Sequence, residues 1–316
     1  MSPGAATGEG RWDAPDPRRA RARTTLGELS YLSFGEGPAV VLLHGWPAWS
    51  FLWRREVPLL GSRMRVIAPD LLGYGQSDRP QDADLSLESQ AACVRELLDG
   101  LGIETFAAVG HGFGGGVAQA LALGGGVGAL GLVDSVAFDA WPSPATRALQ
   151  ARDPASATEQ DARRTVEEWL RRATAKSLLR ESELGAYLDP WLASPASLFR
   201  AARGVDGRGL AGREADLGAL DVPTFVLWGE EDPFLPPSLA ERLGDLYDGA
   251  MVALLPGCGH LVMEDAPQTV GPLLYEFLRL RYLGEPHGHA ETGPVPVFLH
   301  RPTDDDLREA GLAEED

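Results

Sequence analysis

The sequence predicts an α/β fold in which a mostly parallel, doubly wound sheet carries an inserted helical cap. Three observations predict this fold class. Short apolar runs recur along the chain, helical patterns separate several of them, and one long helical stretch interrupts the alternation. Continuous apolar strands that alternate with helices are typical of a parallel sheet that is covered on both faces.

The predicted strands are short apolar runs that each end in Gly, Pro or Asp. They lie at 39–45, 64–70, 105–110, 129–134, 223–229 and 250–257. The stretch 86–102 predicts a helix, because it begins with a Ser cap, has apolar spacings of three and four, and closes with Gly. Ligands of such sheets bind at the carboxyl ends of the strands. The candidate functional residues are therefore those directly after each run.

The alternation also divides the chain. It stops near Phe138 and resumes near Asp221, and the residues between are helical, Arg-rich and studded with aromatic side chains. We interpret them as a cap that either contacts a ligand or only forms a helical layer with its own small core. The predicted organisation is a flexible N-terminal extension (1–23), a core (24–138 and 213–283), a helical cap (139–212) and an acidic C-terminal tail (284–316).

Composition limits the partners. The 316 residues hold 46 Asp and Glu against 28 Lys and Arg, a formal net charge of −18, which argues against nucleic acid or an anionic membrane as the main partner. Two cysteines, Cys93 and Cys258, suit a reducing compartment. No secretory leader and no run of about 18 apolar residues is visible. We expect a cytoplasmic protein that acts on a small molecule, in an oligomeric state that the sequence leaves open.

No cofactor or metal is expected. His287, His289 and His300 are loosely spaced and have no supporting Cys or paired carboxylates, so a solvated tail is favoured over a metal site. The glycines 114–116 are not followed by Lys-Ser/Thr, so they are not a phosphate loop.

The residues that follow the predicted strands form a coherent set of motifs. They are His44-Gly45-Trp46-Pro47, the stretch 70–78 (DLLGYGQSD), Gly110-His111-Gly112-Phe113-Gly114-Gly115, the stretch 228–232 (WGEED) and Gly257-Cys258-Gly259-His260. In this order, from about Gly27 to Tyr282, they resemble the α/β-hydrolase superfamily and imply its fold. HGWPAWSFLWRREVPLL and DLLGYGQSDRP look most like the haloalkane dehalogenase and epoxide hydrolase branch, although serine esterases share a similar pattern.

The resemblance implies a nucleophile at a sharp strand-to-helix turn with small flanking residues. In this chain the nucleophile position is Gly112, which has no side chain, so covalent catalysis through this turn is impossible. The rest of the apparatus is present. The resemblance places His260 as the base and Asp232 as the acid that orients it, with Asp134 as an alternative acid. It also places the oxyanion-binding N–H groups at Trp46 and Phe113, and the indole of Trp46 is a further candidate donor.

Aromatic residues are the candidates for a substrate pocket. We expect Trp46, Phe113, Trp141 and Tyr187 to line it and to favour a small apolar molecule. Related dehalogenases often carry Trp where this chain has Phe113, and epoxide hydrolases use two cap tyrosines where this cap has only Tyr187. His44 and His111 are interpreted as hydrogen-bonding residues that organise loops.

Glycine at position 112 is expected to relax the strained turn and to open space beside His260. Three hypotheses follow. In the first, His260 and Asp232 perform acid/base chemistry without a covalent step, such as elimination, cyclisation, epoxide opening or direct water attack. In the second, Gly112 replaces an Asp or Ser nucleophile of an ordinary hydrolase. In the third, the protein is a non-catalytic binder of a small apolar ligand.

Overall fold

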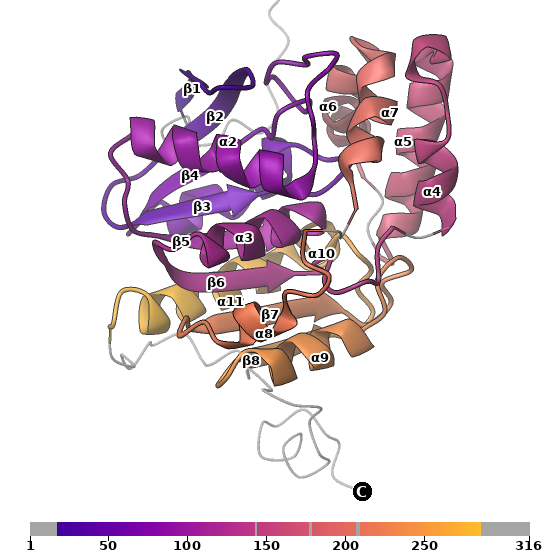
Figure 1. Cartoon of the computed structure of the whole chain (residues 1–316). Coiled ribbons are helices and arrows are strands. Elements are labelled where there is room, and N and C mark those ends of the chain that lie inside the picture. Colours follow the sequence, from indigo (N-terminus) through magenta and orange to yellow (C-terminus); the bar gives the residue numbers. More distant parts are fainter. Residues whose placement is uncertain (1–17, 143, 177–178, 207–208, 286–316) are drawn as a thin grey trace, which may run out of the picture.

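The computed structural model describes residues 18–142, 144–176, 179–206 and 209–285, and an eight-stranded sheet lies at its centre (Figure 1). The strand order is β1-β2-β4-β3-β5-β6-β7-β8. Strands β3 to β8 run parallel, whereas β2 pairs antiparallel with both β1 and β4. The strands are β1 Arg18–Arg23, β2 Glu28–Phe34, β3 Ala39–Leu43, β4 Arg65–Pro69, β5 Phe106–His111, β6 Val127–Val133, β7 Thr224–Gly229 and β8 Met251–Leu255.

Helices cover both faces of this sheet. Helices α2 and α3 lie on one face, and α11 lies behind the sheet in Figure 1. The helices are α1 Val57–Leu60, α2 Leu87–Gly100, α3 Phe113–Leu123, α4 Pro144–Gln150, α5 Glu159–Ala173, α6 Glu181–Leu192, α7 Pro195–Gly204, α8 Glu214–Gly218, α9 Ser238–Leu246, α10 Val262–Asp265 and α11 Pro267–Arg281, with 3₁₀ turns η1 Ser50–Trp53 and η2 Pro154–Ser156.

The predicted fold class is confirmed, and so is the position of its strands. All six apolar runs form strands β3 to β8, and every residue of β3, β5 and β7 is buried. The predicted helix is α2, in which the Ser86 side chain accepts a hydrogen bond from the backbone N–H of Ser89. Apolar residues at these positions are buried by layers on both sides, which is why the periodicity predicted them correctly.

The N-terminal extension was predicted too long. Residues 18–23 form β1, an edge strand that pairs along its whole length with β2. Arg19 anchors it, donating to the Ser30 and Ser50 hydroxyls at 2.8 and 2.9 Å and to the buried Asp70 carboxylate at 2.8 Å. Alternating Arg and Ala side chains suit an edge strand with one solvated face. The strand was missed because its residues were assigned to a flexible N-terminal extension.

Helices α4 to α7 lie between β6 and β7 and stand beside the sheet (Figure 1). This α4–α7 layer corresponds to the predicted cap, and the exact division at residues 139 and 212 stays a prediction. Helix α8, which follows it, contacts α3 and α9 of the sheet's own layers. Residues 1–17 and the tail from residue 286 on, including His287, His289 and His300, lie outside the described residues.

None of the described helices combines the length and the apolarity that a membrane-spanning segment requires.

A buried arginine–glutamate network joins the α4–α7 layer to the sheet. Arg54 and Arg55, which follow η1, each contact both Glu183 of α6 and Glu264 of α10 at 2.5 to 3.1 Å. Tyr187 of α6 donates to the same Glu264 carboxylate at 2.6 Å. Removing one partner of such a buried network costs about 3–5 kcal/mol, because the remaining charges lose their compensation. The network therefore fixes the layer relative to α10, which directly follows His260.

Glu56 lies beside this network and is fully buried, and neither of its carboxyl oxygens has a hydrogen-bonding partner among the described residues. Burial raises the pKa of Glu56 to about 8, although Arg54 and Arg55 oppose the shift. The folded protein therefore holds this proton at pH values where an unfolded Glu, with a pKa of about 4.3, has lost it.

We predict that the Glu56 carboxyl destabilises the protein progressively as the pH rises from about 5 to about 8. Over this interval the folded state binds more protons than the unfolded state, so the free energy of unfolding falls. Glu56→Gln should remove that pH dependence and be more stable than the parent at pH 8. Urea unfolding at several pH values measures it, with the exposed Glu36→Gln as the control. Parallel curves for the parent and Glu56→Gln would contradict the prediction.

Candidate functional site

The turn between β5 and α3 places the candidate site at the carboxyl end of the sheet. Gly112 lies at the turn with φ +54° and ψ −121°, and α3 begins at the next residue. A Cβ atom at Gly114 would collide with the backbone carbonyls of Leu43 and His44 at the end of β3. Glycine is required there because helix and strand approach this closely.

The turn holds Gly112 at a positive φ, a conformation that glycine adopts without strain. A Cβ atom at position 112 would lie 3.3 Å from Nε2 of His260 and 3.6 Å from Cα of Gly45. A side chain at position 112 would therefore point at the imidazole of His260. With glycine at this position, no side-chain atom lies between the turn and Nε2.

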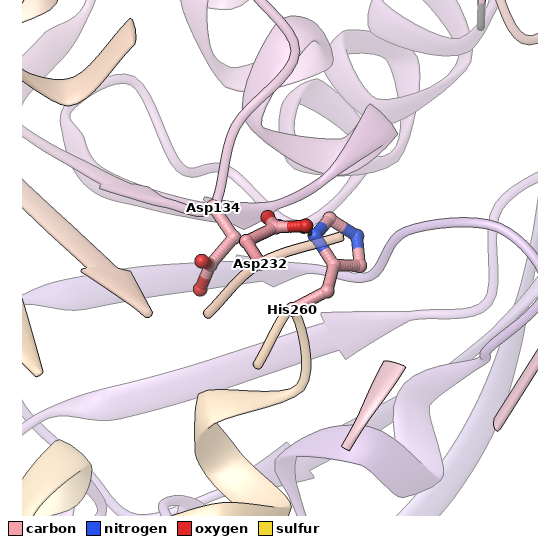
Figure 2. A group of neighbouring side chains, drawn as sticks. All are labelled: Asp134, Asp232 and His260. Atoms are coloured by element: carbon pink, nitrogen blue, oxygen red, sulfur yellow. Dashed lines mark hydrogen bonds and ion pairs between the residues drawn. The ribbon is translucent and has the colours of Figure 1, made fainter. Parts of the chain in front are cut away.

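His260 and Asp232, the predicted base and acid, lie in contact with each other. Nδ1 of His260 is 2.7 Å from Oδ2 of Asp232, and both side chains are almost completely buried (Figure 2). Oδ1 of Asp232 accepts hydrogen bonds from the backbone N–H groups of Phe234 and Leu235 at 2.8 and 3.0 Å. This arrangement fixes the carboxylate against Nδ1 and leaves Nε2 on the side of Gly112. Within the described residues Nε2 has no hydrogen-bonding partner.

Asp134 is the second carboxylate of the site, on the side of Asp232 that faces away from the imidazole (Figure 2). It directly follows β6, is fully buried, and makes no hydrogen bond to His260 within the described residues. The geometry thus favours Asp232 over Asp134 as the partner of the base.

The two backbone groups predicted to bind an oxyanion are both available. The N–H groups of Trp46 and Phe113 have no hydrogen-bonding partner in the part of the chain that the structure describes, and Phe113 is the first residue of α3. A helix N-terminus favours negative charge. The indole N–H of Trp46, a further candidate donor, is already used. Its Nε1 donates to the carbonyl of Leu198 in α7 at 3.3 Å.

Two aromatic rings that the sequence analysis did not place at the site contact His260 directly. Trp169 of α5 and Phe234 lie edge-on to the imidazole, with ring centroids at 5.7 and 5.4 Å. The two rings stack on each other at 5.3 Å, and Trp46 meets Trp169 edge-on at 6.0 Å. Phe234 lies two residues after Asp232, and this spacing was the available signal. Trp169 comes from a distant element, and its sequence pattern indicated only a buried helix face.

The other three predicted pocket residues form no described ring contact with His260. Tyr187 is fully buried in the arginine–glutamate network and packs edge-on against Phe51. Trp141 is buried with its Nε1 unpaired within the described residues, and Phe113 is buried at the start of α3. Neither Trp141 nor Tyr187 forms a described ring contact with His260. A cavity of about 620 Å³ lies along α5 and α6, lined in part by Arg164, Arg171 and Lys176, and neither Gly112 nor His260 lines it.

His44 and His111 organise loops, as predicted. The backbone N–H of Leu71 donates to Nε2 of His44 at 2.9 Å, and Nε2 of His111 lies 2.9 Å from the carbonyl oxygen of His260. Burial lowers the pKa of His44 to about 4 and holds the pKa of His111 well below its usual value. Both rings are therefore neutral at pH 7, and His111 supports the backbone of the base.

Asp134, Asp232 and His260 each bring one potential ligand atom within 4.8 Å of the others. A cation bound by all three would have to displace the hydrogen bond between Nδ1 of His260 and Asp232. Because Nδ1 of His260 and the carboxylate of Asp232 already bind each other, we interpret the three residues as an acid–base group and not as a metal site.

Comparisons with known proteins agree with the fold. The model of the family described as "alpha/beta hydrolase fold" matches residues 38–267. Haloalkane dehalogenase 2 of Mycobacterium tuberculosis is 28% identical over 275 residues, which are 80% of this chain and 92% of that protein. The 2-hydroxymuconate semialdehyde hydrolase of a Pseudomonas species is 33% identical over 248 residues, 77% of this chain and 84% of that enzyme. The crystal structure of an α/β hydrolase fold protein from Burkholderia ambifaria superposes with a TM-score of 0.74, at 32% identity over 81% of this chain and 97% of that one.

We predict that Gly112→Ala lowers the free energy of unfolding by about 1–3 kcal/mol, because a Cβ atom is strained at this positive φ. The new methyl group would also lie 3.3 Å from Nε2 of His260. Gly100→Ala is the matched control, since no atom lies within 4 Å of its Cβ position. Urea unfolding of the two variants measures the difference. Equal stabilities would show that the turn does not constrain residue 112.

Proposed function

Because the chain belongs to the α/β hydrolase fold family, we propose that it is an enzyme in which His260 activates a water molecule directly, without a covalent nucleophile. One observation carries the proposal. Nε2 of His260 faces the vacant side-chain position of Gly112, and Nδ1 of the same ring is held by Asp232 at 2.7 Å. A base that is oriented in this way beside a residue without a side chain can act on water or substrate, but not on a nucleophile of the turn.

The reacting water would lie within about 2.6–3.2 Å of Nε2, the reach of a general base. On this side Nε2 has no hydrogen-bonding partner among the described residues and faces the backbone of Gly112. In the proposed step, Nε2 takes one proton from water while the oxygen bonds to an electrophilic carbon of the substrate. The imidazolium, stabilised by Asp232, then returns that proton to the leaving group.

The backbone groups at the turn suit the charge that this step creates. If the electrophile is a carbonyl, its oxygen gains negative charge as water attacks. The N–H groups of Trp46 and Phe113 are unpaired within the described residues and flank the turn. Such preorganised donors lower the barrier because they need no reorganisation during the reaction.

The surroundings of the base favour a small apolar substrate. Trp169 and Phe234 contact His260, and Trp46 contacts Trp169, so aromatic surface surrounds the imidazole on the side of the α4–α7 layer. Rings of this kind bind apolar molecules through buried area. His260 itself is only 4% exposed, so the proposed reaction takes place away from bulk water.

We predict that His260→Ala lowers the turnover of any hydrolysed substrate by at least about 100-fold, because general-base catalysis contributes that much or more. A panel of aryl esters, epoxides, haloalkanes and an unsaturated keto acid serves as the probe. Asp232→Asn should lower turnover of the same compound strongly, since it removes the charge that stabilises the imidazolium. Glu230→Gln removes an exposed carboxylate from the same loop and should leave turnover unchanged.

A single turnover in water enriched in heavy oxygen tests the absence of a covalent step. Direct attack places the heavy oxygen in the product of the first turnover, and mass spectrometry of the quenched protein finds no adduct. Turnover that is unaffected by His260→Ala would contradict the proposal. Tight binding of a panel compound without chemical change, and without dependence on His260 or Asp232, would support a non-catalytic binder instead.

A second candidate function is covalent hydrolysis by a form of this protein that carries Asp or Ser at position 112. The retained backbone of the turn favours it, since φ +54° and ψ −121° still direct a side chain at His260.

We predict that Gly112→Asp or Gly112→Ser gains covalent turnover on part of the same panel if this second candidate is correct. His260 would deprotonate an introduced Ser, or would activate the water that hydrolyses the ester formed by an introduced Asp. The gain in turnover should therefore disappear in the double variant with His260→Ala. A trapped covalent adduct identified by mass spectrometry measures it. Two folded variants that are both inactive on the whole panel would rule out this candidate.

A further inference from the structure

Asp134 has a chemical environment that the proposed reaction does not yet use. It is fully buried, and its φ of +42° is rare for a residue other than glycine. Its backbone N–H donates to the carbonyl of Leu227 at 3.0 Å, and its Oδ1 accepts from the backbone N–H of Gly229 at 2.8 Å. Strained residues of this kind persist where surrounding contacts hold them. Here the contacts hold a carboxyl group next to Asp232, on the side away from His260 (Figure 2).

The two aspartates differ in the number of donors that they receive. Asp232 accepts from the backbone N–H groups of Phe234 and Leu235 and lies 2.7 Å from Nδ1 of His260. Asp134 accepts only from Gly229, and its Oδ2 has no conventional donor within the described residues. Hydrogen bonds to a carboxylate stabilise its charged form, so the environment stabilises a charge on Asp232 far better than on Asp134.

The short distance between the two carboxyl groups means that this difference decides which of them is ionised. One oxygen of each carboxyl group and one ring nitrogen of His260 all lie within 4.8 Å of one another, with every group buried. Two carboxylates this close, away from water, do not both ionise readily, and the less favoured one keeps its proton.

We propose that Asp134 keeps a proton on its Oδ2 atom and directs it at the ionised Asp232, as a positioning residue for the Asp232–His260 pair. The pair of aspartates then carries one negative charge, which matches the single positive charge that His260 acquires during catalysis. The proton on Asp134 also binds the carboxylate of Asp232 on the side opposite to His260. This last role rests on the function proposed above, whereas the protonation itself does not.

The titratable neighbours of Asp134 agree with this assignment. Burial raises the pKa of Asp134 well above its usual value, and the charge of Asp232 raises it further. Asp265 of α10 is a further acidic neighbour and accepts from the backbone N–H groups of Ala175, Lys176 and Gly259. Cys258 also lies near, and burial holds the pKa of its thiol at about 11, so this thiol is neutral. His260 lies beyond Asp232, and its one titratable ring neighbour among the described residues, His111, is neutral.

Infrared difference spectroscopy of the full chain at pH 7 tests the proton directly, without a substrate. Subtracting the spectrum of Asp134→Asn from that of the parent should reveal the C=O stretch of a protonated carboxyl group. Labelling the aspartate side-chain carboxyls with a heavy carbon isotope should shift this band. Glu56→Gln is the matched control, because it removes a second buried protonated carboxyl group whose band this label does not shift. Loss of a carboxylate band in place of the C=O band would overturn the proposal.

The positioning role has a separate readout. NMR follows the pH at which the imidazole of His260 protonates in the parent, in Asp134→Asn and in Asp134→Ala. Asn retains the shape and a donor, so its midpoint should match that of the parent. Were Asp134 ionised, removing its charge would lower the midpoint by about one to three pH units. That result would overturn the proposal even if turnover were unaffected.

Turnover of a panel compound completes the test. Asp134→Asn should stay within a few-fold of the parent, whereas Asp134→Ala should lose kcat, with a smaller change in KM. If the infrared and NMR results agree with the proposal while no panel compound is turned over, the protonated Asp134 stands and the proposed function fails. If both variants unfold, the labelled parent protein still reports the C=O band, and its absence would contradict the proposal.

Discussion

The close approach of the β5–α3 turn to the end of β3 is the constraint on which the site depends. Gly114 meets the carbonyls of Leu43 and His44 so closely that any side chain would collide. This contact brings the loop after β3, with Trp46, against the first residue of α3. Because both N–H groups come from elements held by the central sheet, their spacing is fixed by backbone packing and not by flexible side chains.

His260 is held from two directions. On one side, Asp232 binds Nδ1 of His260, and His111 lies within hydrogen-bond distance of its carbonyl oxygen. On the other side, α10 follows immediately, and Glu264 within it is bound by two arginines. The same arginines bind Glu183 of the α4–α7 layer. One network of charges therefore couples the position of the α4–α7 layer to the position of the imidazole. Trp169 of this layer lies against the imidazole ring.

Much of the fold and part of the site could be predicted from the sequence, for one physical reason. Strands buried on both faces are continuous apolar runs, and the residues at their carboxyl ends share one edge of the sheet. Asp232 and His260 both follow predicted strands, and the resemblance to the α/β hydrolases implied their pairing as acid and base. Strand β1 was missed, because an edge strand with one wet face needs few apolar residues. The contact of Trp169 with His260 was also missed, since it joins residues about ninety positions apart through helix packing.

The sequence by itself determined that position 112 has no side chain. The family resemblance that it carries singled out His260 and Asp232 as the candidates beside that position. Only the tertiary structure decided that the turn keeps a positive φ and directs its vacant position at Nε2 of His260. Only the tertiary structure decided, too, that Asp134 lies next to Asp232 and accepts fewer hydrogen bonds than Asp232 does. Backbone path and donor counts depend on contacts between distant segments, and no local pattern encodes them.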